Sequence, residues 1–471
     1  MNVTSSPSGL RAKVSIPELL ALFTRLLNQP GGQPWPTAPS GRPYFYRRVW
    51  SPVVTLWYLL WSHLQSDATL DAVVKDARAG GADALGAPGK KLSARIQSRA
   101  TTAYSNARQR LPLRWLWRAF TQCTERLRGQ VSGLDWHGMR VILLDGSTVR
   151  VRPHGNLPKR CAPAANQYGH SYWCLIRVVA GFCATSGLAL VTGLSAETVS
   201  EQALAVPLLL RGGAARLWLG DRNFGIWRIA RAAVQAQSHV LVRLTSARAR
   251  CLVAGRLTDG LDVPVGWTPT RHDQADAGVD RLPVPGRVVV VWLVRPGFRP
   301  EWLSLFTTLT DPTVFPAAEL VAKYGVRWHV ELNLRYLKAE MNLGQLDVQS
   351  ARMAIKQWYA GLLAYNLIRG VMLWAAATTD GVARDPLGLS FAQTRRLLGH
   401  TLRGWQYTGP GERLGLWERL LADVAATVPP RRRKPRPAEP RRQRPVPRAF
   451  PVLRGSRAAA RARLAEEQMK S

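Results

Sequence analysis

Two short apolar runs, each followed by an aspartate, are the feature that most restricts the fold of this 471-residue chain. Residues 140–145 read Arg-Val-Ile-Leu-Leu-Asp, with Gly146 next, and residues 216–221 read Arg-Leu-Trp-Leu-Gly-Asp. A short apolar run bounded by a turn signal predicts a buried strand. Each strand is therefore expected to deliver a carboxylate, Asp145 or Asp221, at its end.

Further strands and helices alternate around these two runs. Strands are expected at residues 175–180, 188–192 and 239–244, and helices at residues 200–210 and 226–237. Strands mixed with helices indicate an α/β domain, and aspartates at two strand ends predict a site along one edge of its sheet. A Gly- and Pro-rich stretch at residues 246–302 predicts a small β-rich insertion, after which residues 302–308 return to strand.

Residues 324–338 are predicted to be helical throughout, because they contain no Pro and no Gly after Gly325. At about 100° per residue, Tyr324, Arg327, Glu331 and Lys338 fall on one face of that helix. One aromatic ring, two cations and one carboxylate on a single face suit a helix that binds a metal ion and a phosphate backbone. The alternative is a solvated face with weak ion pairs.

The spacing of these four residues, Y-x2-R-x3-E-x6-K, resembles the Y-R-E-K signature of the insertion-sequence-four (IS4) family of DDE transposases. The resemblance covers about residues 135–380, and it includes Asp-Gly-Ser-Thr at residues 145–148 and Gly-Asp-Arg-x-Phe at residues 220–224. It implies a ribonuclease-H-like α/β catalytic core with an inserted β-rich subdomain at residues 246–302. It also implies three catalytic acids that bind metal, namely Asp145, Asp221 and Glu331.

The chemistry implied by the resemblance is the cleavage and transfer of DNA strands by two Mg²⁺ ions, with Mn²⁺ able to substitute. Two such ions about 3.5–4 Å apart activate the attacking oxygen and stabilise the leaving oxygen. The resemblance further implies that Tyr324, Arg327 and Lys338 bind phosphates beside the cleavage point. It places a base-stacking Trp late in the insertion, at Trp302 or else Trp292, and the alternative for either is a core strand aromatic. The further DNA-binding candidates are Arg222 and Arg335.

Charge and composition divide the residues outside the expected catalytic core into three regions. The net charge of +35 indicates a polyanionic partner, and nucleic acid is the default. Residues 1–130 are expected to form a helical DNA-binding domain, with helices at residues 16–27, 49–64 and 92–111, although a merely solvated basic helix explains the last one equally well. Residues 381–428 are expected to be helical. Residues 429–471 form a basic Pro/Arg-rich tail, expected to be disordered when free and to bind phosphates.

Membrane insertion is not expected. The long apolar run at residues 358–378 is interrupted by Asn366 and Arg369, which predicts a buried helix instead of a membrane span. No signal peptide is indicated, and the five cysteines show neither CxxC pairs nor zinc spacing. We therefore expect a bacterial cytoplasmic protein that is associated with the nucleoid through DNA.

The function expected from these observations is that of an insertion-sequence transposase, which cuts DNA at the element ends and joins them to a target. Its partners would be the terminal inverted repeats, the target DNA and a second copy of the chain. Two alternatives remain open on the sequence, a catalytically inactive transposase-derived DNA-binding protein and a metal nuclease of the same fold. The three intact acids argue against the first alternative, and the basic arms favour a protein that holds several DNA segments together.

Overall fold

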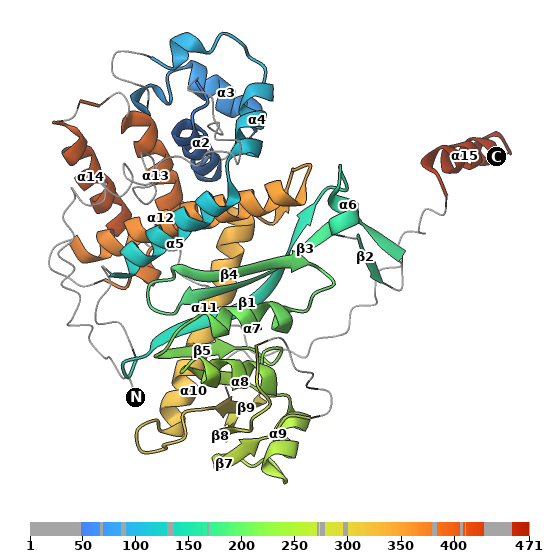
Figure 1. Ribbon diagram of the computed structural model, residues 1–471, viewed down its shortest axis with the longest axis vertical. Coiled ribbons are helices and arrows are strands. Elements are labelled where there is room, and N and C mark those ends of the chain that lie inside the picture. The colour runs from blue at the N-terminus through green and yellow to red at the C-terminus, as the bar shows by residue number, and fades with distance from the viewer. Residues whose placement is uncertain are drawn as a thin grey trace.

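A computed structural model describes residues 49–427 and 455–470, except for residues 66–68, 86–90, 130–135, 162, 167–168, 271–272, 274–277, 295–299, 379–383, 406–407 and 410. The protein is built around a mixed ten-stranded sheet in the order β2-β3-β1-β5-β6-β9-β8-β7, with β4 paired to β3 and β10 paired to β1 (Figure 1). The helix expected at residues 16–27 lies outside the described residues.

The centre of the sheet contains the strands expected from the apolar runs. β1 (Arg140–Val151) pairs antiparallel with β3 (Gly169–Cys183) and parallel with β5 (Arg216–Gly220), and β5 pairs parallel with β6 (His239–Arg243). The smaller strands are β2 (Pro163–Asn166), β4 (Ala189–Ala196) and β10 (Gln345–Leu346). The α/β prediction is therefore confirmed, with a sheet of mixed direction.

Helices cover both faces of this sheet. As a result, alternate residues of β1 are buried in two different hydrophobic cores. Val141 and Leu143 join the core that also contains residues of α5 (Leu113–Gly129) and α12 (Ala351–Thr378). Ile142 and Leu144 join the core that contains residues of α7 (Glu201–Leu210) and α8 (Trp227–Gln235). A strand buried on both faces needs no polar alternation, which explains its continuous apolar sequence.

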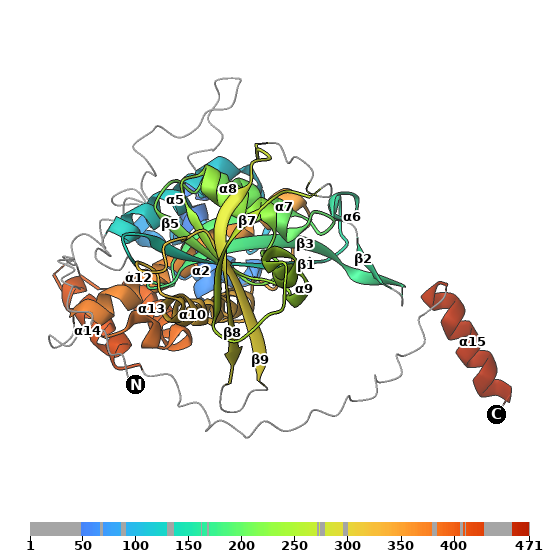
Figure 2. The ribbon, with the colours of Figure 1, turned by 90° about the horizontal axis from the view of Figure 1, so that it is seen from below.

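The stretch expected to form a β-rich insertion extends the central sheet. It contains α9 (Ser246–Val253), β7 (Leu261–Trp267) and β8 (Val284–Leu293), and β9 (Glu301–Thr307) is the strand expected after it at residues 302–308. β9 pairs antiparallel with β6, and β8 and β7 follow it toward the edge. This pairing satisfies the backbone groups that β6 would otherwise expose at an open edge. The β8–β9 hairpin projects from the body of the protein (Figure 2).

The apolar helix α12 is the central helix of the larger core, as expected. It is long and apolar enough to cross a membrane, but 94% of its apolar window is buried inside the protein. Its two polar interruptions are satisfied internally. The Asn366 side chain bonds to both backbone groups of Ala189 and to Thr124, and Arg369 Nη2 donates to Asn333 Oδ1 at 2.7 Å. A buried core helix therefore accounts for the whole run.

The helices at the N-terminal end pack partly on the body of the protein that contains the sheet. α2 (Pro52–Leu64) and α5 contribute to the same core as α12, whereas α3 (Leu70–Arg78) and α4 (Thr102–Arg110) form a small separate cluster with part of α2. The single helix expected at residues 92–111 is wrong. A short 3₁₀ turn, η2 (Ser93–Arg95), is followed by extended chain, and α4 begins at Thr102.

The remaining short helices are η1 (Asp83–Leu85), α6 (Leu157–Arg160), η5 (Pro386–Gly388), α13 (Phe391–Trp405) and α14 (Arg413–Ala425). α13 and α14 occupy the region expected to be helical after residue 381. In the basic tail, residues 457–470 form α15 (Arg457–Lys470), which lies apart from the body (Figures 1 and 2). Disorder throughout the tail was therefore the wrong expectation. Pro is confined to its first half, and the last part is rich in Ala and Arg, which favour a helix.

Candidate active site

Asp145 and Asp221 lie at the same edge of the parallel strand pair. β5 ends at Gly220, so Asp221 follows its strand directly, as expected. The expectation that Asp145 ends its strand is wrong, because β1 continues to Val151. The pairing of β1 with β5 nevertheless stops at Leu143, while β1 goes on against β3. Asp145 therefore lies just beyond the point where its parallel neighbour ends.

Each aspartate is held by one backbone N–H group. Gly146 N donates to Asp145 Oδ1 at 2.8 Å, and Asn223 N donates to Asp221 Oδ1 at 2.9 Å. Burial raises the pKa of Asp145 to about 7; the Gly146 hydrogen bond opposes this shift, and the charge of Asp221 adds to it. The two carboxylates are thus close enough to repel each other in a partly dry environment.

The helical segment that carries Glu331 changes its winding along its length. α10 (Ala317–Gly325) passes into a 3₁₀ turn, η3 (Val326–Trp328), then into α11 (His329–Arg335), and then into a π-helical turn, η4 (Tyr336–Glu340). The segment is helical as expected, but uniform α-helical winding is wrong for it. The π-turn holds Lys338, and π-turns occur frequently at functional sites.

Arg327 links the third acid to the first. Its Nη2 donates to Glu331 Oε1 at 2.9 Å. Its charge also lowers the pKa of Asp145, while burial raises the pKa of that carboxyl more strongly. On the other side, Arg327 hydrogen-bonds to the buried Tyr324 hydroxyl, whose pKa is raised to about 12 by burial. Tyr324, Arg327 and Glu331 therefore form one contact chain, and the charge of Arg327 in this chain acts on Asp145.

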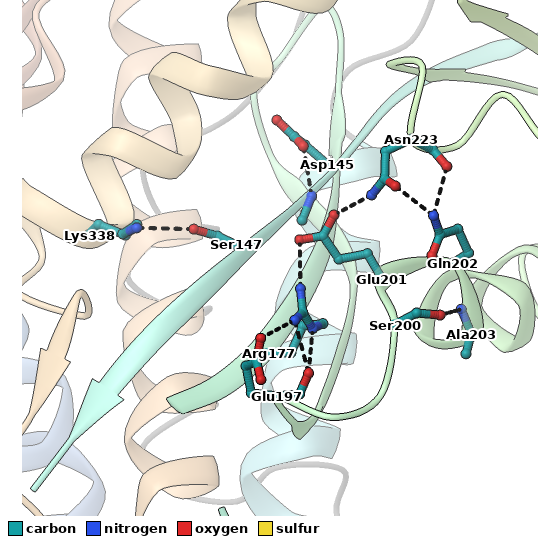
Figure 3. A network of polar contacts seen from close by, with 11 residues as sticks. Asp145, Ser147, Arg177, Glu197, Ser200, Glu201, Gln202, Ala203, Asn223 and Lys338 are labelled. Atoms are coloured by element: carbon teal, nitrogen blue, oxygen red, sulfur yellow. Dashed lines mark hydrogen bonds and ion pairs between the residues drawn. The ribbon is translucent and has the colours of Figure 1, made fainter. Parts of the chain in front are cut away.

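Lys338 contacts β1 directly. Its Nζ donates to Ser147 Oγ at 3.1 Å (Figure 3). Ser147 is two residues after Asp145, and side chains two apart on a strand point to the same face. Lys338 therefore lies on the same side of β1 as Asp145.

Helix α11 is anchored to the core beside Glu331. Asn333, two residues further on, is buried and accepts the hydrogen bond from Arg369 of α12. The Arg369 guanidinium also packs over the rings of Tyr336, Tyr365 and Phe391. Rigid support of this kind limits how far the Glu331 backbone can move.

The remaining sequence candidates are exposed. Arg222 follows Asp221 on the loop after β5, and Arg335 lies at the end of α11. Trp302 and Trp292 are paired across β9 and β8 with ring centroids 4.8 Å apart, and they are 38% and 43% exposed. The core-aromatic alternative is therefore wrong for both Trp residues, and two exposed aromatic faces are available on the projecting hairpin.

A second polar cluster beside Asp145 has no signal in the sequence. Glu201 accepts hydrogen bonds from Arg177 and Asn223, and Arg177 is also bound by Glu197 (Figure 3). Arg177 falls inside the strand expected at residues 175–180, where a charged residue is unusual, but its sequence context does not indicate its partners. Arg177 pairs with Glu201 on α7 and with Glu197 in the loop before it, and Glu201 also pairs with Asn223 in the loop after β5, so chain spacing does not relate these residues.

The donor set suits a hard divalent cation. Among the described residues, neither Asp145 Oδ2 nor Asp221 Oδ2 accepts a hydrogen bond or ion pair. Each aspartate can thus offer an oxygen, and a cation would relieve their repulsion; oxygen ligands are what Mg²⁺ and Mn²⁺ prefer. Within the described part of the chain, however, no group of three or more Asp, Glu, His or Cys side chains is gathered around one point. Glu331 is held by Arg327 instead of facing the two aspartates.

Comparisons with known proteins identify relatives of this chain. A family model described as "Transposase DDE domain" matches residues 136–367. The transposase InsG of insertion sequence element IS4 from Escherichia coli (strain K12) is 25% identical over 321 residues, which are 66% of this chain and 70% of InsG. A solved structure of piggyBac transposase in a synaptic complex with hairpin DNA is 12% identical, with a TM-score of 0.40 over 88% of this chain and 84% of that one.

The matched family region begins just before β1 and ends within α12. It therefore contains both aspartates, the exposed Trp pair and the whole segment from Tyr324 to Lys338. Enzymes of this class depend on divalent metal, cut DNA and transfer the cut strand. The matched domain and the similarity to InsG together support a DDE transposase of the IS4 family.

Proposed function

We propose that Asp145, Asp221 and Glu331 are the catalytic acids of this transposase and that they bind two Mg²⁺ ions, for which Mn²⁺ can substitute. The observation that carries the proposal is the position of Asp145 and Asp221 beside each other at the end of the β1–β5 pairing, with Arg327 joining Asp145 to Glu331. When bound, the ions make the attacking oxygen nucleophilic and stabilise the leaving oxygen. The core is proposed to be ribonuclease-H-like.

The cations of the Y-R-E-K segment are proposed to bind the DNA phosphates next to the cut. In the protein without DNA, Arg327 neutralises Glu331, and Lys338 rests on the Ser147 hydroxyl. A phosphate is a stronger partner for both cations than these neighbours, because it offers several charged oxygens. Transfer of Arg327 to a phosphate would release Glu331 toward the two aspartates. DNA binding would in this way complete the acid set.

Other exposed residues and the N-terminal helices are proposed to bind different parts of the DNA. Arg222 and Arg335 are proposed to contact the backbone, and Trp302, with Trp292 beside it, to stack on an unpaired base. The N-terminal helices are proposed to bind the terminal inverted repeats. The chain is proposed to act as a homodimer that joins these ends to target DNA in the bacterial cytoplasm. The test is whether purified protein with Mg²⁺ cuts and joins DNA bearing the inverted repeats that flank its gene.

Metal binding should depend on pH through Asp145. Because burial and the charge of Asp221 raise the pKa of Asp145 to about 7, its carboxyl carries a proton at lower pH. A metal ion has to displace that proton, so affinity should rise about tenfold per pH unit below 7 and level off above it. Calorimetric titration with Mn²⁺ from pH 5.5 to 8.5 measures this slope, and an affinity independent of pH would contradict it.

The basic tail should strengthen binding to DNA of any sequence. Deleting residues 431–471 removes many Lys and Arg residues, which bind DNA mainly by displacing counterions from the phosphates. The slope of log affinity against log salt should become shallower by about 0.9 for each phosphate that the tail neutralises, equally for end DNA and random DNA. Fluorescence anisotropy at several salt concentrations measures both slopes. If the slopes do not change, the tail does not touch DNA.

A further inference from the structure

Glu201, the first residue of α7, has a partly buried carboxylate that contacts Gly146, next to Asp145, and Asn223, near Asp221. Its Oε1 accepts from Arg177 Nη1 at 3.3 Å, and its Oε2 accepts from Asn223 Nδ2 at 2.6 Å (Figure 3). The side chains of Arg177 and Glu201 are 18% and 19% exposed, so water competes little for these contacts. Another negative charge beside Asp145 and Asp221 is unfavourable by itself, which indicates that Glu201 has a specific role.

Asn223 connects Glu201 to Asp221. The backbone N–H of Asn223 donates to Asp221 Oδ1, while its side-chain NH₂ donates to Glu201. Gln202 Nε2 donates to Asn223 Oδ1 at 2.6 Å and to the Asn223 carbonyl oxygen at 3.0 Å. These bonds fix the orientation of the Asn223 amide, because its oxygen must face the Gln202 donor and its NH₂ must face Glu201. The loop that carries Asp221 is thereby tied to the start of α7.

Gly146 connects Glu201 to Asp145. A Cβ atom at position 146 would overlap with the Glu201 carboxylate, so the carboxylate lies directly against the backbone there. The N–H of the same Gly146 donates to Asp145 Oδ1. The place of the Glu201 carboxylate therefore limits where the Asp145 backbone can lie.

We propose that Glu201 is a positioning residue, which sets the separation of Asp145 and Asp221 for a divalent cation by its contacts with Gly146 and Asn223. The inference rests on the proposed function, in which those aspartates bind the metal. Arg177 occupies one Glu201 oxygen and Asn223 the other, so Glu201 acts through its neighbours and does not ligate the ion. Arg177 in turn is held by the Glu197 carbonyl oxygen, to which its Nε and Nη2 donate.

The test is Mn²⁺ binding to the full-length protein without DNA, followed by the paramagnetic resonance signal of free Mn²⁺. In Glu201→Gln, the amide can accept at one atom only, so its NH₂ must face a donor of Arg177 or of Asn223. The dissociation constant for Mn²⁺ should rise about 10- to 100-fold, as is typical for loss of a residue that orients metal ligands. Asn223→Ala should also weaken Mn²⁺ binding. The double variant Glu201→Gln/Asn223→Ala should bind Mn²⁺ about as weakly as either single variant, because both substitutions break the same Glu201–Asn223 hydrogen bond.

Glu197→Gln is the matched control, because the Glu197 side chain also pairs with Arg177, at 2.6 Å, whereas the links to Gly146 and Asn223 are made by Glu201. Its Mn²⁺ affinity should stay within about threefold of the native value, since the Arg177 bonds to the backbone remain. Thermal unfolding of both variants measures any general loss of stability. Asp145→Ala tests the proposed function separately, because it should abolish the binding if the aspartates form the metal site.

Three results would overturn the positioning role. One is an unchanged Mn²⁺ affinity in Glu201→Gln together with loss of binding in Asp145→Ala. This result would mean that the metal site exists but does not depend on Glu201. Another is an equal loss of affinity in Glu201→Gln and Glu197→Gln, which would indicate a general structural effect. The third is complete loss of binding in Glu201→Gln, as in Asp145→Ala, which would make Glu201 a ligand. If Asp145→Ala binds Mn²⁺ like the native protein, the proposed metal site itself is wrong.

Discussion

Replacing Asp145, Asp221 or Glu331 by Ala should reduce DNA cleavage by about 10³-fold or more while leaving binding to the element ends nearly unchanged. A metal ion stabilises the charge of the transition state by several kcal/mol, and each 1.36 kcal/mol corresponds to a tenfold change in rate. Binding depends mainly on phosphate contacts elsewhere on the protein. The measurements are the single-turnover cleavage rate with saturating Mg²⁺ and the affinity for end DNA.

A surface carboxylate serves as the control for this experiment. Asp71 forms an exposed ion pair with Lys75 in α3, and such pairs contribute little to stability. Asp71→Ala should therefore cleave at the native rate. Glu331 is the decisive member of the three, because it is bound to Arg327 in the protein without DNA. A Glu331→Ala protein that still cuts its substrate would remove this residue from the catalytic acids.

Arg327→Lys should slow cleavage by about 100-fold although the positive charge is kept, since even a displacement of about 1 Å at a reacting centre can have that effect. Arg327 contacts Glu331 and Tyr324 at once and faces Asp145, and a planar guanidinium can serve several partners in fixed directions. A Lys ammonium cannot also grip a phosphate through two parallel N–H bonds. The measurement is the cleavage rate of a pre-formed complex with end DNA.

Substitutions at Lys338 and His329 test the helix face that is assigned to Arg327 and Glu331. Lys338 makes one contact, to Ser147, and acts as a point charge, so Lys338→Arg should slow cleavage by no more than about tenfold. His329, half-buried at the start of α11, is about 160° from Glu331 by helical geometry, so His329→Ala should be tolerated. An effect of His329→Ala as large as that of Arg327→Lys would mean that this helix is assigned the wrong face.

The Arg327–Glu331 pair also bears on the alternative functions. A nuclease and a transposase of this fold would use the same acids and differ in the nucleophile, which is water in one and the freed DNA 3′-OH in the other. The similarity to DDE transposases, including the IS4 transposase InsG, favours strand transfer. A catalytically inactive protein would have no need for an Arg that pairs with Glu331 and acts on Asp145 if these are the proposed catalytic acids. A joining assay with pre-cut ends separates these cases, because it requires the transfer step alone.

Local sequence was sufficient to predict the strands and helices whose signal lies in their own apolar pattern. The apolar runs before Asp145 and Asp221 became β1 and β5, and the run around Asn366 became the buried helix α12. Burial on both faces leaves a continuous apolar signature that needs no knowledge of the partner strands. The Y-R-E-K spacing was informative for the same reason, since residues three, four and seven apart on a helix share a face whatever surrounds it.

Local sequence failed where the answer depended on which segments pair. It placed Asp145 at the end of a strand, whereas β3 keeps β1 extended for six further residues. It set the segment that forms β7 and β8 apart from the core as an insertion, whereas both strands continue the central sheet beyond β9. Strand pairing joins distant parts of the chain. The amino-acid composition of one strand does not indicate which other strand it pairs with.

The sequence alone determined the α/β class, the basic character, the apolar strands that lead into Asp145 and Asp221, and the helix that carries Glu331. The tertiary structure decided how these parts meet. It brought Arg327 between Glu331 and Asp145, put Lys338 on Ser147, and placed Glu201 against Gly146 and Asn223. A residue's propensity and periodicity act within a few turns of chain, whereas a buried charge is stabilised by whichever polar group the fold brings to it. For that reason Glu201 has no recognisable spacing in the sequence, although its carboxylate contacts the neighbours of both aspartates.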